Sequence, residues 1–200
     1  MSTPKVKFCG IKSRSDIEYV NELKPDYIGF VFAPRSKRHV DEAKAKELKA
    51  ALDKGITAVG VFVDEDINTV SHLLNEGVID IAQLHGTEDE EYIRALHKLT
   101  DKPLIKAFLI KNNEDSAKAE ETEADYILLD SGRGEGRLLD RELLGNIKRP
   151  YFLAGGLDPE NVREAYKSLQ PFALDVSSGI ETDGCKDYDK MKKFMEELGR

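Results

Sequence analysis

The sequence predicts a single α/β domain that folds as a (β/α)8 barrel of the TIM type. Short apolar runs recur about every 20–30 residues and are apolar on both faces, as buried parallel strands are. Charged stretches with helix-start signals lie between these runs. This alternation predicts parallel strands joined by right-handed crossovers, and eight such units favour a closed barrel over an open sheet.

The length and charge of the chain fit one globular domain over residues 1–200. A chain of 200 residues is long enough for one core, although this fold typically needs about 250 residues. The hydrophobic share of 40% is ordinary for a globular protein. The net charge of −8 argues against a nucleic-acid partner, because nucleic-acid binders usually carry a basic surface.

The two cysteines and the lack of long apolar runs indicate the cellular setting. Cys9 and Cys185 lie at opposite ends of the chain, so neither a disulfide framework nor a zinc site is expected. No apolar run approaches the ~20 residues that cross a bilayer, and the N-terminus lacks a signal-peptide core. We therefore expect a cytoplasmic protein with no membrane partner.

The eight predicted strands are the apolar runs themselves, taken in chain order. They are VKF (6–8), YIGFVF (27–32), TAVGVFV (57–63), DIAQL (80–84), LIKAF (104–108), YILLD (126–130), YFLAG (151–155) and FALDV (172–176).

The predicted helices begin at residues whose side chains can cap a helix N-terminus. These residues are Ser15 with Asp16, Asp41, Asp66 with Asn68, Thr87, Asp158 ahead of Pro159 and Glu160, and Asp187. Proline is favoured at the first helical position, which supports a start at Asp158. The segment 112–123 has few apolar residues and carries the weakest helix pattern.

Polar and reactive residues follow the predicted strands, where a barrel of this type places its active site. They are Cys9 and Gly10, the run 33–39, Asp64, His85, Lys106, Asp130 with Ser131, Gly155 with Gly156, and Asp175 with Ser177, Ser178 and Gly179. Their shared position predicts one site at the carboxyl ends of the strands.

The glycines after strands seven and eight favour a phosphate site. Such barrels frequently hold phosphate on the backbone N–H groups of these two loops, here Gly155-Gly156 and Ser177-Ser178-Gly179. The alternative is a pair of tight turns. The run GRGEGR (132–137) matches neither a Walker loop nor GxGxxG, and we interpret it as a flexible loop over the barrel mouth.

Cys9 and Asp130 are the candidate acid–base residues, and each has a simpler alternative. A free cysteine is more often a buried small hydrophobe, but Cys9 ends a strand at a polar mouth. Asp130 ends an apolar run, so burial is expected to raise its pKa and favour proton donation; otherwise it caps a turn. His85 is a further candidate ligand or base, although a lone histidine after a strand is usually a hydrogen-bonded structural residue. The RSKRH run is either a solvated basic patch or an attractant for an anionic substrate.

Seven ordered motifs resemble those of the phosphoribosylanthranilate isomerase family of tryptophan biosynthesis. They are KFCGIKS (7–13), GFVFAPRSKRHV (29–40), VGVFVDE (59–65), AQLHGTED (82–89), ILLDS (127–131), LAGGLDPENV (153–162) and DVSSGIET (175–182). The resemblance implies a (β/α)8 barrel that converts N-(5-phosphoribosyl)anthranilate to 1-(2-carboxyphenylamino)-1-deoxyribulose 5-phosphate, an Amadori rearrangement that needs no cofactor and no metal.

The resemblance also implies a role for each matching residue. Cys9 would be the general base and Asp130 the general acid, while Arg38 would hold the anthranilate carboxylate. His85 would line the pocket. Asp175 would support the phosphate loops, which contain Gly155, Gly156, Ser178 and Gly179. The expected partner is the phosphorylated small-molecule substrate. The sequence leaves open whether the chain is a monomer or a homodimer.

One motif departs from the family pattern. Family members often carry Gly-Gly-x-Gly-Lys in the sixth loop, followed by an aromatic residue, aspartate and tryptophan. This chain has Leu139 in place of the aromatic residue and Arg141 in place of the tryptophan. Two other functions are consistent with a phosphosugar barrel: a histidine-pathway type of isomerase, and a binding protein without turnover. One pair of phosphate loops argues against the first, and the presence of both Cys9 and Asp130 argues against the second.

Overall fold

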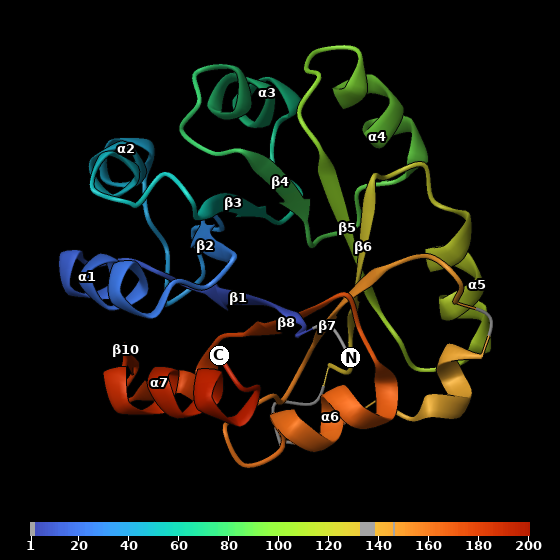
Figure 1. Cartoon of the computed structure of the whole chain (residues 1–200). Helices are drawn as coiled ribbons and strands as arrows, with labels where there is room; N and C mark the ends of the chain where they lie inside the picture. Colours follow the sequence, from blue (N-terminus) through green and yellow to red (C-terminus); the bar gives the residue numbers. More distant parts are fainter. Residues whose placement is uncertain (1–2, 133–138, 146) are drawn as a thin grey trace.

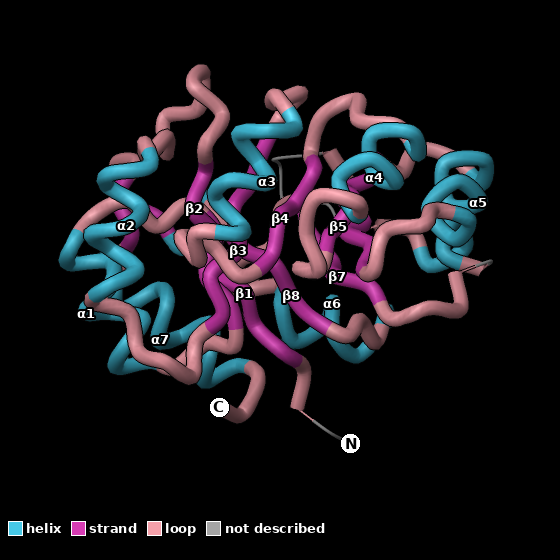
Figure 2. Tube along the Cα trace, turned by 90° about the horizontal axis from the view of Figure 1, so that it is seen from above, coloured by secondary structure: helices cyan, strands magenta, loops and turns pink. Residues whose placement is uncertain are grey.

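Eight parallel strands form a closed barrel in the order β1 to β8, which confirms the predicted fold. The computed structural model describes residues 3–132, 139–145 and 147–200. Figure 1 shows the strands at the centre with the helices around them, and Figure 2 shows the same arrangement from above. The strands are β1 (Lys5–Cys9), β2 (Tyr27–Val31), β3 (Thr57–Phe62), β4 (Ile81–Leu84), β5 (Leu104–Leu109), β6 (Tyr126–Asp130), β7 (Tyr151–Ala154) and β8 (Ala173–Val176).

Helices follow the strands along most of the described chain. They are α1 (Arg14–Leu23), α2 (Glu42–Ala50), α3 (Ile67–Asn75), α4 (Glu90–His97), α5 (Asn113–Glu121), α6 (Val162–Leu169) and α7 (Tyr188–Glu197), with the short 3-10 helices η1 (Arg141–Leu144) and η2 (Ser178–Ile180). None of the helices in the described ranges has the length and apolar character that a membrane span requires.

Three helices begin at residues other than those predicted. The side chain of Ser13, not Ser15, accepts a hydrogen bond from Asp16 N at the start of α1. Asp89, rather than Thr87, caps α4. Asn161 precedes α6, because Asp158 Oδ1 accepts from the N–H groups of residues 160 and 161 and so holds a turn ahead of the helix.

The segment with the weakest pattern does form a helix, because its first turn is well capped. In α5 the Asn112 side chain accepts from the N–H groups of Glu114 and Asp115. The Asp115 carboxylate accepts in return from Asn112 N at 3.2 Å. This capping box supports a helix that buries little, namely Ser116 and Ala119.

The connection from β6 to β7 differs from the other crossovers. Its described residues contain only the 3-10 helix η1, and no helix start was predicted between residues 131 and 150. Of the predicted mouth loop (132–137), residues 133–137 lie outside the described residues. After β8 the chain also forms a short antiparallel hairpin that was not predicted, β9 (Glu181–Thr182) with β10 (Cys185–Lys186).

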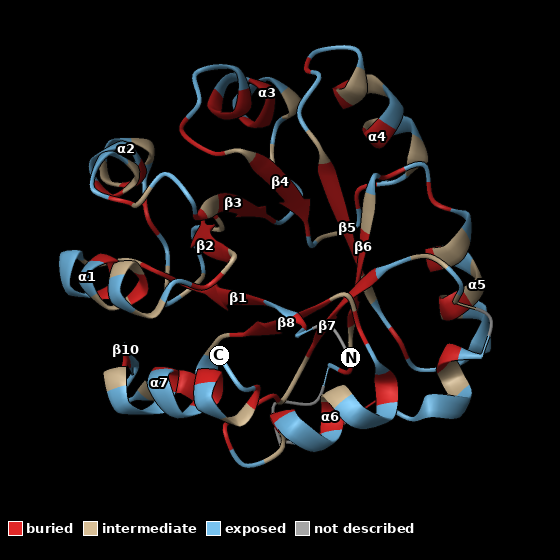
Figure 3. Ribbon diagram, viewed as in Figure 1, coloured by how far each residue is buried: buried red, intermediate tan, exposed pale blue. Residues whose placement is uncertain are grey.

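Each strand packs against helices on its outer face and against other strands inside the barrel, which explains why the runs are apolar on both faces. Alternate residues point outward against the helices, such as Phe8, Ile28 and Leu129. The others point into the barrel, such as Val59, Ile105 and Leu128. Figure 3 shows the strands buried along their length, whereas the helices are buried only on their inner sides.

The barrel interior is aromatic at its amino-terminal end and polar at its carboxyl end. Phe152 is fully buried and packs edge-on against Tyr27, Tyr126 and Phe172 at centroid distances of 5.3, 6.1 and 5.7 Å. The Lys5 ammonium lies 5.4 Å from the Tyr27 ring centroid. This aromatic layer fills the amino-terminal end, so only the carboxyl end is available for a ligand.

Phe152→Ala should therefore lower the free energy of unfolding by about 3–5 kcal/mol, because it leaves a cavity inside the aromatic layer. Chemical denaturation measures this change. Leu99→Ala is the control: Leu99 is 45% exposed, and its loss should change stability by no more than about 0.5 kcal/mol. Equal effects of the two substitutions would contradict this account of the interior.

Candidate active site

The residues predicted for the site line one cavity at the carboxyl end of the barrel. Its volume is about 380 Å³, within the range of about 300–1,000 Å³ typical of small-molecule sites. The predicted residues that line it are Cys9, Arg38, His85, Asp130, Gly155, Gly156, Asp175 and Ser178. Eight of the nine residues to which the family resemblance gives a role thus meet in one place, and Gly179 follows directly after Ser178. Of the other strand-end residues, Asp64 and Lys106 do not line this cavity.

A buried ion pair lies beneath the cavity beside the cysteine. The Lys7 Nζ atom, fully buried, donates to Asp175 Oδ2 at 2.8 Å. Lys7 and Asp175 are register partners on β1 and β8. Because side chains two residues apart share a strand face, Lys7 and Cys9 both point into the barrel. Burial acts against the charge of Lys7, but Asp175 and Cys9 outweigh it and raise the pKa of Lys7.

The thiol of Cys9 is influenced by opposing effects. Burial raises its pKa, and this effect is the largest. Lys7 and Lys186 lower the pKa of Cys9, while Asp175 raises it. The net result is a raised pKa, so Cys9 is mostly a neutral thiol at pH 7 in the free protein. The expected help from Lys7 is therefore present but does not outweigh burial.

Asp130 lies across the cavity in a chain of three polar side chains. His85 Nε2 lies 3.4 Å from Asp130 Oδ2, and Gln83 Nε2 lies 2.9 Å from His85 Nδ1. With the Gln83 amide donating, the neutral imidazole carries its proton on Nε2, facing Asp130. Gln83 is buried, and its Oε1 has no hydrogen-bond partner among the described residues.

The pKa of Asp130 is lowered, which contradicts the prediction that burial would raise it. Burial does act to raise it and is the largest single effect. The hydrogen bond with His85 and the one from Gly132 N, at 2.8 Å, together outweigh burial. Asp130 is therefore ionised at neutral pH in the free protein. Sequence alone placed the carboxyl group at the mouth but did not indicate its donors.

Arg38 reaches the cavity already paired with a carboxylate. Its Nε and Nη2 atoms donate to Glu181 Oε1 and Oε2, each at 2.6 Å. Glu181 Oε1 also accepts from Lys186 Nζ at 2.7 Å, and Lys186 Nζ donates to Ser177 O at 2.9 Å. Burial would raise the pKa of Glu181, but Arg38 and Lys186 outweigh it and lower the pKa to about 2.

The loops after β7 and β8 approach each other closely, and glycine permits this. Gly155, after β7, has φ +93° and lies against the loop after β6, where a Cβ atom would be 2.2 Å from Ser131 Oγ. A Cβ atom on Gly179 would lie 2.0 Å from Leu157 O. The two loops therefore meet with backbone exposed at the cavity edge, an arrangement that suits an anion held by N–H groups.

Gln83 lines the cavity and escaped prediction, as did the pairing of Glu181 and Lys186 beside Arg38. Ser36 and Ser177 also line the cavity; both were predicted at the strand ends but without a role of their own. Gln83 lies two residues before His85 on the same strand face, a spacing that would have indicated it. No local pattern links Glu181 to Arg38, which are 143 residues apart. Within the described ranges, no group of three or more histidine, cysteine or carboxylate side chains is placed to hold a metal ion.

Comparison with known proteins identifies the family. The family model described as N-(5'phosphoribosyl)anthranilate (PRA) isomerase matches residues 6–197. A relative from Endomicrobium trichonymphae named N-(5'-phosphoribosyl)anthranilate isomerase is 44% identical over 193 residues, which cover 94% of each chain. The chain belongs to the N-(5'-phosphoribosyl)anthranilate isomerase family. The resemblance seen in the seven motifs is thereby confirmed, as is the isomerase class.

Solved structures of the family have the same fold along nearly the whole chain. The phosphoribosyl anthranilate isomerase of Thermotoga maritima is 34% identical, with a TM-score of 0.87 and 98% of each chain covered. A second isomerase structure, in complex with reduced 1-(o-carboxyphenylamino)-1-deoxyribulose 5-phosphate, is 35% identical, with a TM-score of 0.83 and 98% of each chain covered.

Charge changes around Cys9 should shift its pKa in opposite directions. Lys7→Met removes a cation and should raise the thiol pKa, whereas Asp175→Asn removes an anion and should lower it. The rate of iodoacetamide alkylation against pH measures both shifts, in a Cys185→Ser background so that only one thiol reacts. Shifts in the same direction would contradict the electrostatic account.

Removal of the histidine should raise the pKa of Asp130. His85→Asn deletes a hydrogen bond that favours the carboxylate form of Asp130, so the pKa of Asp130 should move upward. On acidification the variant should therefore gain a proton at Asp130 at a higher pH than the wild type does. Carboxyl 13C NMR titration measures this. His72→Asn, at an exposed Glu42 pair, is the control and should leave Asp130 unchanged.

Proposed function

We propose that this chain converts N-(5-phosphoribosyl)anthranilate to 1-(2-carboxyphenylamino)-1-deoxyribulose 5-phosphate, with Cys9 as general base and Asp130 as general acid. The observation that carries the proposal is the shared cavity, in which a thiol, a carboxylate, an arginine and two glycine-rich loops meet. Each group matches one part of the reaction: proton removal, proton donation, carboxylate binding and phosphate binding.

The first step is ring opening. Asp130 donates a proton to the furanose ring oxygen, the C1–O bond breaks, and the nitrogen lone pair forms a C1=N iminium. Because Asp130 is ionised in the free protein, it must gain a proton before it can act as the acid. His85 Nε2, 3.4 Å from Asp130 Oδ2, is close enough to pass a proton to it. A turn of the Gln83 amide would bring Oε1, which lacks a partner among the described residues, to His85 Nδ1.

The second step is proton removal at C2. The iminium withdraws electrons and acidifies the C2 hydrogen, and Cys9 as thiolate takes that proton to give an enolamine. The enolamine then tautomerises to the ketone, with a proton returned to C1. Lys7 lies beside Cys9 and favours the thiolate, while the positive charge of the iminium favours it further.

Substrate binding follows from the distribution of polar groups around the cavity. The phosphate would lie on the backbone of Gly155, Gly156, Ser178 and Gly179. The first three line the cavity, and Gly179 lies against Leu157 O of the loop after β7. The anthranilate carboxylate would lie on Arg38. His85 would contact the sugar end near Asp130, and Asp175 would act through Lys7 rather than on the substrate.

Cys9→Ser and Asp130→Asn should each lower kcat by about 10²–10⁴-fold, the usual contribution of one acid–base group. Loss of anthranilate-conjugate fluorescence measures turnover, and circular dichroism checks the fold. Cys185→Ser, at the exposed free cysteine, is the matched control and should keep full activity. Near-native turnover in either site variant would reject that residue's role.

Growth of a tryptophan auxotroph tests the reaction itself. Expression of the wild-type chain should restore growth without tryptophan, whereas the Cys9→Ser variant should not. A folded wild-type protein that fails to restore growth, and shows no turnover in vitro, would favour a phosphosugar-binding protein without catalysis.

A further inference from the structure

We propose that Glu181, supported by Lys186, is the positioning residue that aims Arg38 at the substrate carboxylate and thereby sets selectivity for a carboxylated aryl group. The inference rests on the proposed function, in which Arg38 binds that carboxylate. It adds a residue from the hairpin after β8 that touches the substrate only through Arg38.

The form of the Arg38–Glu181 contact leaves a binding edge on the arginine. Glu181 uses the side of the guanidinium, with Nε and Nη2 each 2.6 Å from its oxygens. Guanidinium carries five N–H donors in a flat fork. Among the described residues Glu181 occupies two of them, so Nη1 and the outer N–H of Nη2 can bind a second carboxylate end-on. Arg38 lines the cavity and its side chain is 28% exposed, so this edge is accessible to a ligand.

The network behind Glu181 prevents the carboxylate from turning into the cavity itself. Lys186 has a side chain only 1% exposed, and its Nζ atom binds both Glu181 Oε1 and Ser177 O. Glu181 is itself 9% exposed in its side chain. With a pKa of about 2, Glu181 stays ionised across the physiological pH range, so Arg38 keeps its orientation.

The preference for a substrate with a carboxylate distinguishes a positioning role of Glu181 from a role in stability alone. Glu181→Gln keeps the shape but removes the charge that orients Arg38. It should raise KM for the anthranilate substrate about 10- to 100-fold, the effect of losing one charge-assisted hydrogen bond, with a much smaller change in kcat. For N-(5-phosphoribosyl)aniline, which lacks the carboxylate, KM should stay within about twofold of wild type.

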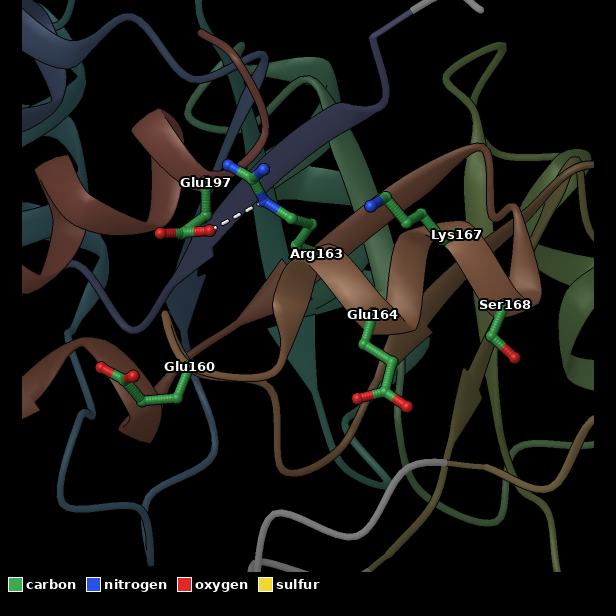
Figure 4. Close-up of a pocket in the computed structure, with 6 residues that line it drawn as sticks. All are labelled: Glu160, Arg163, Glu164, Lys167, Ser168 and Glu197. Carbon is green, nitrogen blue, oxygen red and sulfur yellow. Dashed lines mark hydrogen bonds and ion pairs between the residues drawn. The ribbon is translucent and has the colours of Figure 1, made fainter.

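An exposed arginine–glutamate pair supplies the matched control. Arg163 on α6 donates through Nε to Glu197 on α7 at 2.9 Å, in a surface hollow outside the barrel (Figure 4). Glu197→Gln makes the same chemical change without contact to the mouth. It should leave KM for both substrates at the wild-type value.

Arg38→Ala distinguishes failure of this inference from failure of the proposed function. If Arg38→Ala keeps the preference for the carboxylated substrate, the carboxylate role of Arg38 is wrong. If Arg38→Ala loses that preference but Glu181→Gln keeps it, the positioning role of Glu181 is wrong. Two further results for Glu181→Gln would also overturn the positioning role. One is an equal rise in KM for both substrates; the other is a lower KM, which would mean that Glu181 had competed with the substrate for Arg38.

Discussion

The ion pair of Lys7 with Asp175 links the closure of the barrel to the chemistry at its mouth. These residues are register partners on β1 and β8, the first and last strands, so their contact spans the seam where the sheet closes. A fully buried ammonium is costly unless it is paired, and the 2.8 Å bond to Asp175 provides that pairing. The strand alternation that directs Lys7 inward also directs Cys9 inward, one layer closer to the mouth.

Much of the fold could be predicted, because a strand buried on both faces has few alternatives. The run YILLD coincides with β6, and the other seven predicted strands overlap those observed to within two residues at either end. Helix starts were less predictable wherever two capping residues stand close together. Both Thr87 and Asp89 can cap a helix. In the fold the Thr87 hydroxyl donates to Asp64 instead, and Asp89 accepts from Tyr92 N.

The site was predictable in position but not in its charge state. Strand ends brought Cys9 and Asp130 to one cavity, since the carboxyl ends of parallel strands meet at one end of the barrel. The pKa of Asp130 depends on His85, which follows β4, and on an N–H of its own loop. Both favour the carboxylate and outweigh the burial on which the sequence prediction was based. The Arg38–Glu181 contact joins loops after β2 and β8, a pairing that no local pattern specifies.

The paired charges divide the cavity into two electrostatic halves. On the β1, β2 and β8 side, the three cations Lys7, Arg38 and Lys186 face two carboxylates, Asp175 and Glu181, which leaves an excess of one positive charge. On the β6 side Asp130 is ionised beside His85. An anionic substrate is thus attracted to one wall although the chain carries −8 overall. An iminium formed during ring opening would meet a carboxylate on the other wall, so the same arrangement suits both the substrate and its cationic intermediate.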